Sequence, residues 1–379
     1  MLNKNTKIKV LVIAVKDDRK RFKFLMKPLN ITKTIESEVV LKMKSYPVFL
    51  VRLLLKAVRF KPDLIIAVEA DIIGFSAILL NKLILRSKPV ILRSGGDSIS
   101  PRLTSFRTFL SSRGERSFKE TLRFYKDRIL HTLSMYVYDT CSHFIVVNNS
   151  HAQEFQKFIN LKNRKIFIVP QCLTVEHPNR PRKWATKDTI SFLTVTNLRY
   201  EGKYRGLLEL VRYLQRYVSE GHVKKRKFLL QICGDGYYYS RLLDYINTIA
   251  DKNNALRIRC HGYVRKPSPY YSNADLFMYV SYFDALPNVL LEAQAYGLPI
   301  LVNDYLPFQE SLTDHWNTVF YRSGDFEDFR AKLDELMTNA NLRKRLSANG
   351  MKNIMENYSP ETIAVKLERV INEISNYPR

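Results

Sequence analysis

Two acidic residues stand eight positions apart in the stretch YFDALPNVLLEAQAYGLPIL, residues 282–301, where carboxylates could hold the hydroxyl groups of a ligand. Asp284 precedes a proline and Glu292 follows it. Pro287 suits the first turn of a helix, where its missing N–H is not needed, and Gly297 suits the residue that ends the helix. We therefore expect Asp284 in a loop and Glu292 about one turn inside a helix.

The start of this expected helix is a candidate anion site. Backbone N–H groups at Asn288, Val289 and Leu290 would be free there, and the helix dipole is positive at this end. An acid, an anion site and a second acid fit a sugar, a diphosphate and a ribose in sequence. The alternative is an ordinary capped amphipathic helix with an incidental acid.

The elements around this segment predict an α/β fold. Short apolar runs rich in Ile and Val alternate with helical stretches, as in parallel sheets whose strands are buried on both faces. In the first half the runs lie at residues 8–15, 63–69, 89–94, 143–149 and 165–170. After a polar stretch they lie at residues 189–198, 227–236, 256–264, 275–281 and 299–304. We expect two Rossmann-like parallel sheets joined by a linker, with the ligand in a central cleft between them.

Composition bounds the class of protein. The 379 residues are 46% hydrophobic and 26% charged, which is typical of a folded chain large enough for two domains and excludes a disordered or fibrous one. Every stretch of membrane-spanning length contains charge, so we expect no transmembrane span. The basic N-terminus lacks the pattern of a signal peptide, which predicts a cytoplasmic protein. We expect reduced, mostly buried thiols at the scattered cysteines Cys141, Cys172, Cys233 and Cys260.

Positive charge is concentrated in the first half. Residues 1–180 contain 33 Lys and Arg against 14 Asp and Glu, so they carry +19 of the formal net charge of +25. This excess indicates an anionic partner such as phospholipid, a lipid-linked phosphate or nucleic acid, with a solvated surface as the alternative. In residues 101–138, Arg and Lys interleave with Phe, Leu and Tyr at helical spacing. The segment could lie on an anionic membrane at its inner face, or form a basic helix pair packed on the sheet.

The motif resembles a known family. Residues 275–301 look like the acid-x7-Glu signature of family 4 glycosyltransferases, which are retaining enzymes of the GT-B fold, and the similarity extends over most of 189–358. The stretch QICGDGYYYSRLLDYI, residues 231–246, resembles the family's strand and glycine turn and places Gly234 at the donor site.

The resemblance implies a domain organisation. It gives an N-terminal acceptor-binding domain at 1–175, a linker at 176–188 and a donor-binding domain at 189–358. A last helix within 359–379 would cross back to the N-terminal domain.

The same resemblance implies roles for the acids and for nearby cations. Glu292 would accept hydrogen bonds from the ribose hydroxyls of the donor. Asp284, where the family usually has Glu, would contact the transferred sugar, and Leu290 and its neighbours would bind the diphosphate. The cation pair for the leaving diphosphate would come from TNLRYEGKYRG: Arg199 first, with Lys203 and Arg205 sharing the second role.

The acceptor site is expected near RSGGDS, residues 93–98, where many relatives carry a histidine. Gly95 and Gly96 permit close backbone approach, and Asp97 at the end of a strand could orient or deprotonate an acceptor hydroxyl. Arg93 is a further candidate for this site. A tight turn with a capping Asp is the alternative.

The implied function is a metal-independent, retaining hexosyltransferase that uses a UDP-sugar or GDP-sugar donor without a further cofactor. Its acceptor would be a hydroxyl of a glycan or lipid-linked molecule in cell-surface polysaccharide or glycolipid synthesis. The chain contains no Asp-x-Asp, so side-chain cations are expected to bind the diphosphate. Two alternatives stay open: a catalytically idle GT-B scaffold subunit and a basic nucleic-acid-binding protein, although no nucleic acid is expected. The donor base, sugar, acceptor and linkage are not determined by these residues.

Overall fold

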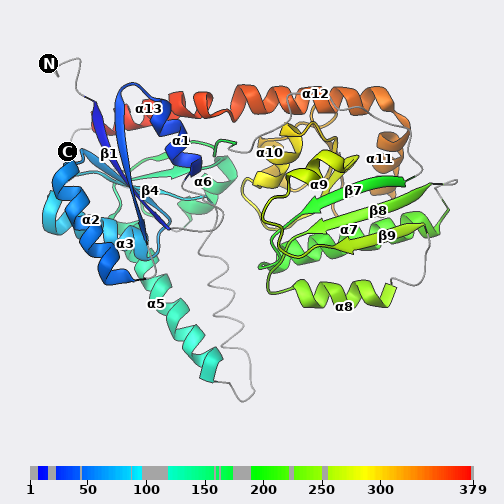
Figure 1. The fold of residues 1–379 in the computed structure, drawn as a ribbon, viewed down its shortest axis with the longest axis horizontal. Coiled ribbons are helices and arrows are strands. Elements are labelled where there is room, and N and C mark those ends of the chain that lie inside the picture. The colour runs from blue at the N-terminus through cyan, green and yellow to red at the C-terminus, as the bar shows by residue number, and fades with distance from the viewer. Residues whose placement is uncertain are drawn as a thin grey trace. The chain divides into compact units, whose positions relative to one another are not determined.

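The chain forms two compact α/β units. The computed structural model describes residues 7–15, 23–42, 45–86, 88–95, 118–157, 159–161, 164–173, 189–221, 226–249 and 255–376. Unit 1 comprises Met1–Thr174 with Tyr358–Arg379, and unit 2 comprises Val175–Asn357. Each unit contains one six-stranded parallel sheet (Figure 1). The predicted fold class is therefore confirmed.

Unit 1 has the strand order β2-β1-β3-β4-β5-β6. Its strands are β1 Ile8–Val15, β2 Ile35–Lys42, β3 Leu64–Val68, β4 Val90–Arg93, β5 His143–Val146 and β6 Ile166–Ile168. Its helices are α1 Lys23–Ile31, α2 Tyr46–Phe60, α3 Ile72–Leu80, the π-helical η1 Asn81–Leu85, α5 Phe118–Thr140, α6 Asn149–Gln156 and α13 Pro360–Ser375.

The helices of unit 1 cover both faces of its sheet. Buried side chains of α2, α3 and α5 share one core with the sheet, and those of α1 and α13 share the core on its other face. Helix α13 is far from the others in sequence, yet it lies beside α1 (Figure 1). There it buries Leu367 and Ile371 in the same core as Leu25 and Leu29. The end of the chain therefore completes the core of the N-terminal sheet.

Unit 2 has the strand order β12-β11-β10-β7-β8-β9. Its strands are β7 Thr189–Val195, β8 Lys227–Cys233, β9 Leu256–Cys260, β10 Leu276–Tyr279, β11 Ile300–Asn303 and β12 Val319–Tyr321. Its helical elements are α7 Glu201–Ser219, α8 Tyr239–Ile249, α9 Ser268–Asn273, α10 Asn288–Ala295, the 3-10 helix η3 Leu306–Glu310, α11 Phe326–Thr338 and α12 Ala340–Asn357. The order of the strands reverses between β7 and β10, which is where open α/β sheets bind ligands.

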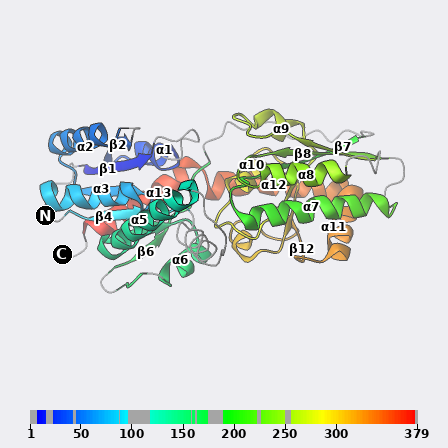
Figure 2. The same ribbon diagram turned by 90° about the horizontal axis from the view of Figure 1, so that it is seen from below.

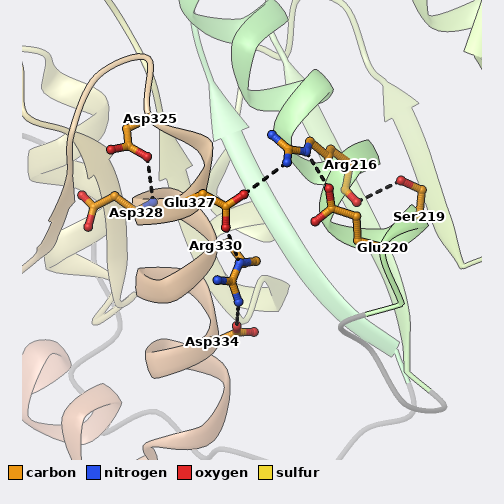
Figure 3. Close-up of polar contacts among 8 residues, drawn as sticks. All are labelled: Arg216, Ser219, Glu220, Asp325, Glu327, Asp328, Arg330 and Asp334. Carbon is orange, nitrogen blue, oxygen red and sulfur yellow. Dashed lines mark hydrogen bonds and ion pairs between the residues drawn. The ribbon is translucent and has the colours of Figure 1, made fainter.

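Helices α7 and α11 pack on the same face of this sheet and are joined at the surface by ion pairs (Figure 3). The guanidinium of Arg216 bonds Glu220 at 2.6 Å on its own helix and Glu327 at 3.1 Å on α11. It also lies 3.9 Å above the ring of Phe326. Exposed pairs of this kind stabilise little singly, so the buried side chains beneath carry most of this contact.

The described residues contain no helix that is both long enough and apolar enough to cross a membrane. All four cysteines are free thiols, and only Cys260 is partly exposed.

Candidate active site

The predicted donor-site residues gather at the point of unit 2 where the strand order reverses. The loop after β7 carries Arg199 and leads into α7, and the loop after β10 carries Asp284 and leads into α10. Strands β7 and β10 are parallel neighbours, so their carboxyl ends open at the same edge of the sheet. The topology therefore brings together segments that lie about 80 residues apart in the sequence.

Lys203 and Asp284 form the centre of this site. The Lys203 Nζ lies 2.6 Å from the Asp284 Oδ1, and the two side chains are only 13% and 10% exposed. The Tyr279 hydroxyl donates to the other oxygen of Asp284 at 2.7 Å, and the Lys203 Nζ donates to that hydroxyl at 3.3 Å. Burial and the charge of Asp284 raise the pKa of Tyr279 well above its usual value, so the hydroxyl keeps its proton. The result is an enclosed cation, carboxylate and hydroxyl in mutual contact.

Arg205 lies away from this pair. Its side chain is exposed, with the guanidinium 5.9 Å from the ring of Tyr282. Residues two apart on a helix point in nearly opposite directions, so α7 cannot aim Arg205 and Lys203 at the same site. Arg199 has an exposed side chain, and its backbone N–H donates to the Asn197 Oδ1 at 3.1 Å, which shapes the loop. The structure thus places Lys203 next to Asp284, with Arg199 on the neighbouring loop.

Glu292 lies on α10, half-buried, as the sequence predicts. The Tyr271 hydroxyl donates to its Oε2 at 2.7 Å. Burial raises the pKa of Glu292 to about 7, and the hydrogen bond from Tyr271 offsets this rise only in part. Tyr271 is itself fixed by stacking on Tyr296, with ring centroids 5.2 Å apart. Among the described residues no cation pairs with Glu292, so its carboxyl is suited to accept hydrogen bonds from neutral hydroxyl groups.

The anion site at the start of α10 is smaller than predicted. The N–H group of Leu290 is not free, because it donates to the carbonyl of Pro287 at 3.1 Å in a tight first turn. For Asn288 and Val289 the described part of the chain offers no acceptor to the backbone N–H groups. The helix therefore presents two N–H groups, not three.

Gly234, predicted at the donor site, lies where two loops of unit 2 come close together. A Cβ at this position would lie 2.0 Å from the carbonyl oxygen of Thr196, so the loops after β7 and β8 approach too closely for any side chain. Its N–H also donates to the carbonyl of Gly262 at 2.8 Å. Gly234 therefore sets the spacing of the loops at this edge of the sheet.

The acceptor-site candidates of unit 1 divide into two groups. Arg93 is buried, its guanidinium donates to the carbonyl oxygens of Val169 at 3.3 Å and Pro170 at 3.5 Å, and burial lowers its pKa to about 10. It therefore joins the ends of β4 and β6, and its role as a binding residue stays a prediction. Gly95 is exposed with open space around it, and Gly96 and Asp97 lie outside the described residues.

Several polar residues near these sites were missed by the sequence analysis. The hydroxyl of Tyr279 donates to Asp284, and that of Tyr271 donates to Glu292. Only the positions of these tyrosines on or just before strand β10 could have indicated this. In unit 1, the Ser94 Oγ and the His151 Nε2 lie 3.4 Å apart, buried at the carboxyl ends of β4 and β5. The motif NNSH after β5 was the available signal for His151.

The basic segment 101–138 is described only in part. Residues 101–117 lie outside the described residues, and 118–138 belong to α5. Buried Val137 and Tyr138 pack the end of α5 on the sheet, whereas Leu122, Tyr125 and Ile129 are exposed.

The sequence of unit 2 matches a family model. Residues 177–353 match the model described as "Glycosyl transferases group 1". Through this segment unit 2 is similar to the group 1 glycosyltransferases. This confirms the resemblance drawn from the acid motif at 275–301.

Two relatives and one solved structure extend this finding. The amylovoran biosynthesis glycosyltransferase AmsD of Erwinia amylovora is 25% identical over 245 residues, 63% of this chain and 65% of the relative, so the chain spans slightly under two thirds of it. The capsular polysaccharide biosynthesis glycosyltransferase CapM of Staphylococcus aureus is 22% identical over 337 residues, 81% of this chain and 84% of the relative. Anabaena Alr3699/HepE in complex with UDP has a TM-score of 0.63 at 12% identity, over 97% of this chain and 100% of that one. The shared fold is GT-B.

Proposed function

We propose that the protein is a retaining glycosyltransferase that moves a hexosyl group from a nucleotide diphosphate sugar to a hydroxyl of a glycan or lipid-linked acceptor. The observation that carries the proposal is the joint placement of Lys203, Asp284 and Glu292 at the strand reversal of the unit that matches the family. The alternative, an ordinary capped helix with an incidental acid, does not explain why the largely buried Lys203 of α7 contacts Asp284.

In this proposal the donor lies along the carboxyl edge of the unit 2 sheet. Arg199, Lys203 and the N–H groups of Asn288 and Val289 bind the diphosphate, where negative charge develops as the sugar leaves. Asp284 orients both Lys203 and the hydroxyls of the sugar. Because these cations and N–H groups stabilise the leaving group, the proposed reaction is metal-independent and needs no further cofactor.

The chemical step needs no protein nucleophile. The bond between the anomeric carbon and the diphosphate oxygen breaks, and the acceptor oxygen bonds to that carbon from the same face. The hydroxyl proton passes to the leaving phosphate oxygen, which becomes part of the nucleoside diphosphate. The configuration of the sugar is thereby retained, and the protein acts by charge and position.

The two units take different parts in the proposal. The donor binds unit 2, predicted as 189–358, and the acceptor binds the domain predicted as 1–175 around Gly95, Gly96 and Asp97. We place the enzyme in the cytoplasm, in cell-surface polysaccharide or glycolipid synthesis. A role in polysaccharide synthesis is supported by the relatives, since AmsD and CapM are described as polysaccharide biosynthesis glycosyltransferases. A UDP-sugar is the first donor to test because HepE was solved with UDP, and a GDP-sugar is the second.

Thermal shift with UDP, GDP, ADP, CMP and their sugar conjugates tests the donor site. A ligand that binds the folded state raises Tm with its affinity. We expect one nucleotide to stabilise the wild type, Glu292→Ala to lose this response, and Glu327→Ala on the exposed face of α11 to keep it. If no nucleotide binds while oligonucleotides bind with strong salt dependence, the nucleic-acid alternative replaces the proposal. Donor binding without turnover on any acceptor would replace it with the idle scaffold.

A further inference from the structure

Helix α2 in unit 1 is apolar on two opposite sides. Its inner side buries Phe49, Leu53, Ala57 and Phe60 in the core. Its outer side carries Val48, Val51, Leu54, Leu55 and Val58, which are between 44% and 57% exposed. These outer residues recur mainly every three or four positions, so they form one stripe facing away from the sheet. A helix with apolar side chains on both sides is expected to be covered on both.

The same feature continues on the neighbouring helices of this face. Helices α2, α3 and α5 lie side by side on one face of the unit 1 sheet (Figure 2). At the end of α3, η1 exposes Leu83 and Ile84, and α5 exposes Leu122, Tyr125 and Ile129 at spacings of three and four. The Lys82 Nζ donates to the Tyr136 hydroxyl at 2.8 Å and so joins η1 to α5. The exposed apolar residues therefore belong to one surface, which we call the α2–α5 face.

Cations accompany these apolar residues. Helix α2 contains Arg52, Lys56 and Arg59 and no acid, and the continuous helical run of α3 and η1 contains Lys82 and no acid. Helix α5 adds Lys126 and Arg128 beside its exposed stripe, with Asp127 between them, so the excess of cations lies on α2 and η1. Apolar side chains flanked by cations fit a surface that is anionic outside and apolar just beneath, which is the chemistry of a bilayer with anionic headgroups.

The positive charge of the α2–α5 face also argues against a second copy of this chain as its partner. A twofold dimer would set the same patch against itself, so cations of one α2 would meet those of the other. Like charges in such a contact oppose association.

We propose that the α2–α5 face docks unit 1 onto the surface of an anionic lipid bilayer. The side chains of Val51, Leu55 and Val58 enter the headgroup boundary, and Arg59 and its basic neighbours contact the lipid phosphates. This places the main contact on α2, which the sequence analysis did not single out, with α5 as its continuation. The proposal goes beyond the transferase function and holds whether or not the donor site works as proposed.

Vesicle sedimentation tests this docking with variants matched in chemistry and exposure. The probes are vesicles of phosphatidylcholine with phosphatidylglycerol and vesicles of phosphatidylcholine alone, at low and high salt. Val51→Glu changes the proposed face at a 57% exposed site, and Val365→Glu makes the same change at a 60% exposed site on α13, which covers the opposite face of the sheet. Arg59→Gln and Arg369→Gln form a second matched pair on the same two helices.

We expect the wild type to bind the anionic vesicles at low salt and to be released by high salt, with no binding to phosphatidylcholine alone. Arg59→Gln should weaken binding about fivefold, which corresponds to one cation near the surface, and Val51→Glu at least as much. Val365→Glu and Arg369→Gln should bind as the wild type does.

Three outcomes would overturn the proposal. They are absence of binding to anionic vesicles, equal loss in Val51→Glu and Val365→Glu, and a wild-type dimer in light scattering that Val51→Glu dissociates, which would assign the face to a second copy. The nucleotide thermal shift, measured on the same variants, stays unchanged if only the docking fails.

Discussion

If the donor binds as proposed, the carboxyl of Glu292 links the stability of the protein to donor binding. Burial raises its pKa from 4.5 to about 7, so the folded protein holds this proton more tightly than the unfolded chain does. The stabilisation from the protonated carboxyl is full below pH 4.5 and is lost as the pH rises through 7. At higher pH the buried charge costs up to about 3 kcal/mol.

We expect Glu292→Gln to be more stable than the wild type at about pH 8 and nearly equal to it below about pH 4.5, because the amide carries no charge at either pH. Chemical denaturation over this pH range measures the difference. Glu327→Gln is an exposed control that should show a much smaller one, since the surface ion pair between Glu327 and Arg216 stabilises little. The wild type should also bind the stabilising nucleotide more weakly below about pH 7, since hydroxyl groups donate to the ionised carboxylate. A stability difference that does not vary with pH would contradict this account.

The hydroxyl of Tyr279 hydrogen-bonds both Asp284 and Lys203 and so holds this pair in place. We expect Tyr279→Phe to cost about 1–2 kcal/mol of stability, since a buried carboxylate loses one donor, and to weaken nucleotide sugar binding. Tyr217→Phe is the matched control, because the hydroxyl of Tyr217 donates to Asp334 at 2.6 Å in the same unit, between α7 and α11. It should lower the stability similarly and leave nucleotide sugar binding intact, as titration calorimetry would measure. Equal effects of both variants on binding would reduce Tyr279 to a stability role.

The sequence predicts the two acidic residues of the site better than the residues that hydrogen-bond them. Asp284 and Glu292 were found because their spacing and the intervening proline define a loop and a helix. Tyr271 and Tyr279 were missed because a tyrosine in an apolar run gives no sign of which buried oxygen its hydroxyl meets. The contacts of Arg93 were missed for a related reason, since nothing in the sequence indicates that it would donate to the carbonyls of Val169 and Pro170, just after β6.

The site depends on how closely α7 approaches the end of β10. A Cβ on Gly206 would lie 2.2 Å from the carbonyl oxygen of Val280, a distance that only displacement of the backbone could relieve. We expect Gly206→Ala to destabilise the protein by more than about 2 kcal/mol and to weaken nucleotide binding, although Ala favours helices by about 1 kcal/mol.

Gly350→Ala on α12 is the control for this change. Its Cβ would lie 3.3 Å from the Cγ of Gln294, a contact that a small side-chain shift can relieve. Thermal unfolding should therefore find it nearly neutral. Unfolding of the two variants at the same temperature would show that α7 does not need this close approach.

The central strands of both sheets were predictable, whereas two of the four edge strands were not. The central strands of both sheets coincide with the predicted apolar runs, because burial on both sides requires Ile, Val and Leu. The runs did not include β2 and β12, which are edge strands. Strand β2 contains exposed Glu36 among its polar residues, and β12 has only three residues. Strands at an edge need fewer apolar residues than central ones, so β2 and β12 lack the pattern on which the prediction depends, while the edge strands β6 and β9 keep it.

The division of the chain into two compact units predicts two separable unfolding events. Leu367→Ala removes a fully buried side chain from the core of unit 1, and Leu210→Ala does the same in unit 2. We expect each change to cost about 2–5 kcal/mol in its own unit.

Differential scanning calorimetry should show a different transition lowered in each variant. The nucleotide should raise only the transition that Leu210→Ala lowers, because the proposed donor site lies in unit 2. A single transition lowered by both variants would mean that the units unfold as one.

Helix α13 has a consequence for the order in which the protein is built on the ribosome. The chain is translated from its N-terminus, so the strands of the first sheet emerge before unit 2, yet residues 358–379 that belong to unit 1 emerge after it. The side chains of Leu25 and Leu29 therefore lack their contacts with α13 while the whole of unit 2 is synthesised. The second unit can fold during translation, and the first becomes complete only once α13 has emerged as well. A truncated chain that lacks α13 would have a folded unit 2 and an incomplete core in unit 1. Such a chain would be a substrate for chaperones and proteases.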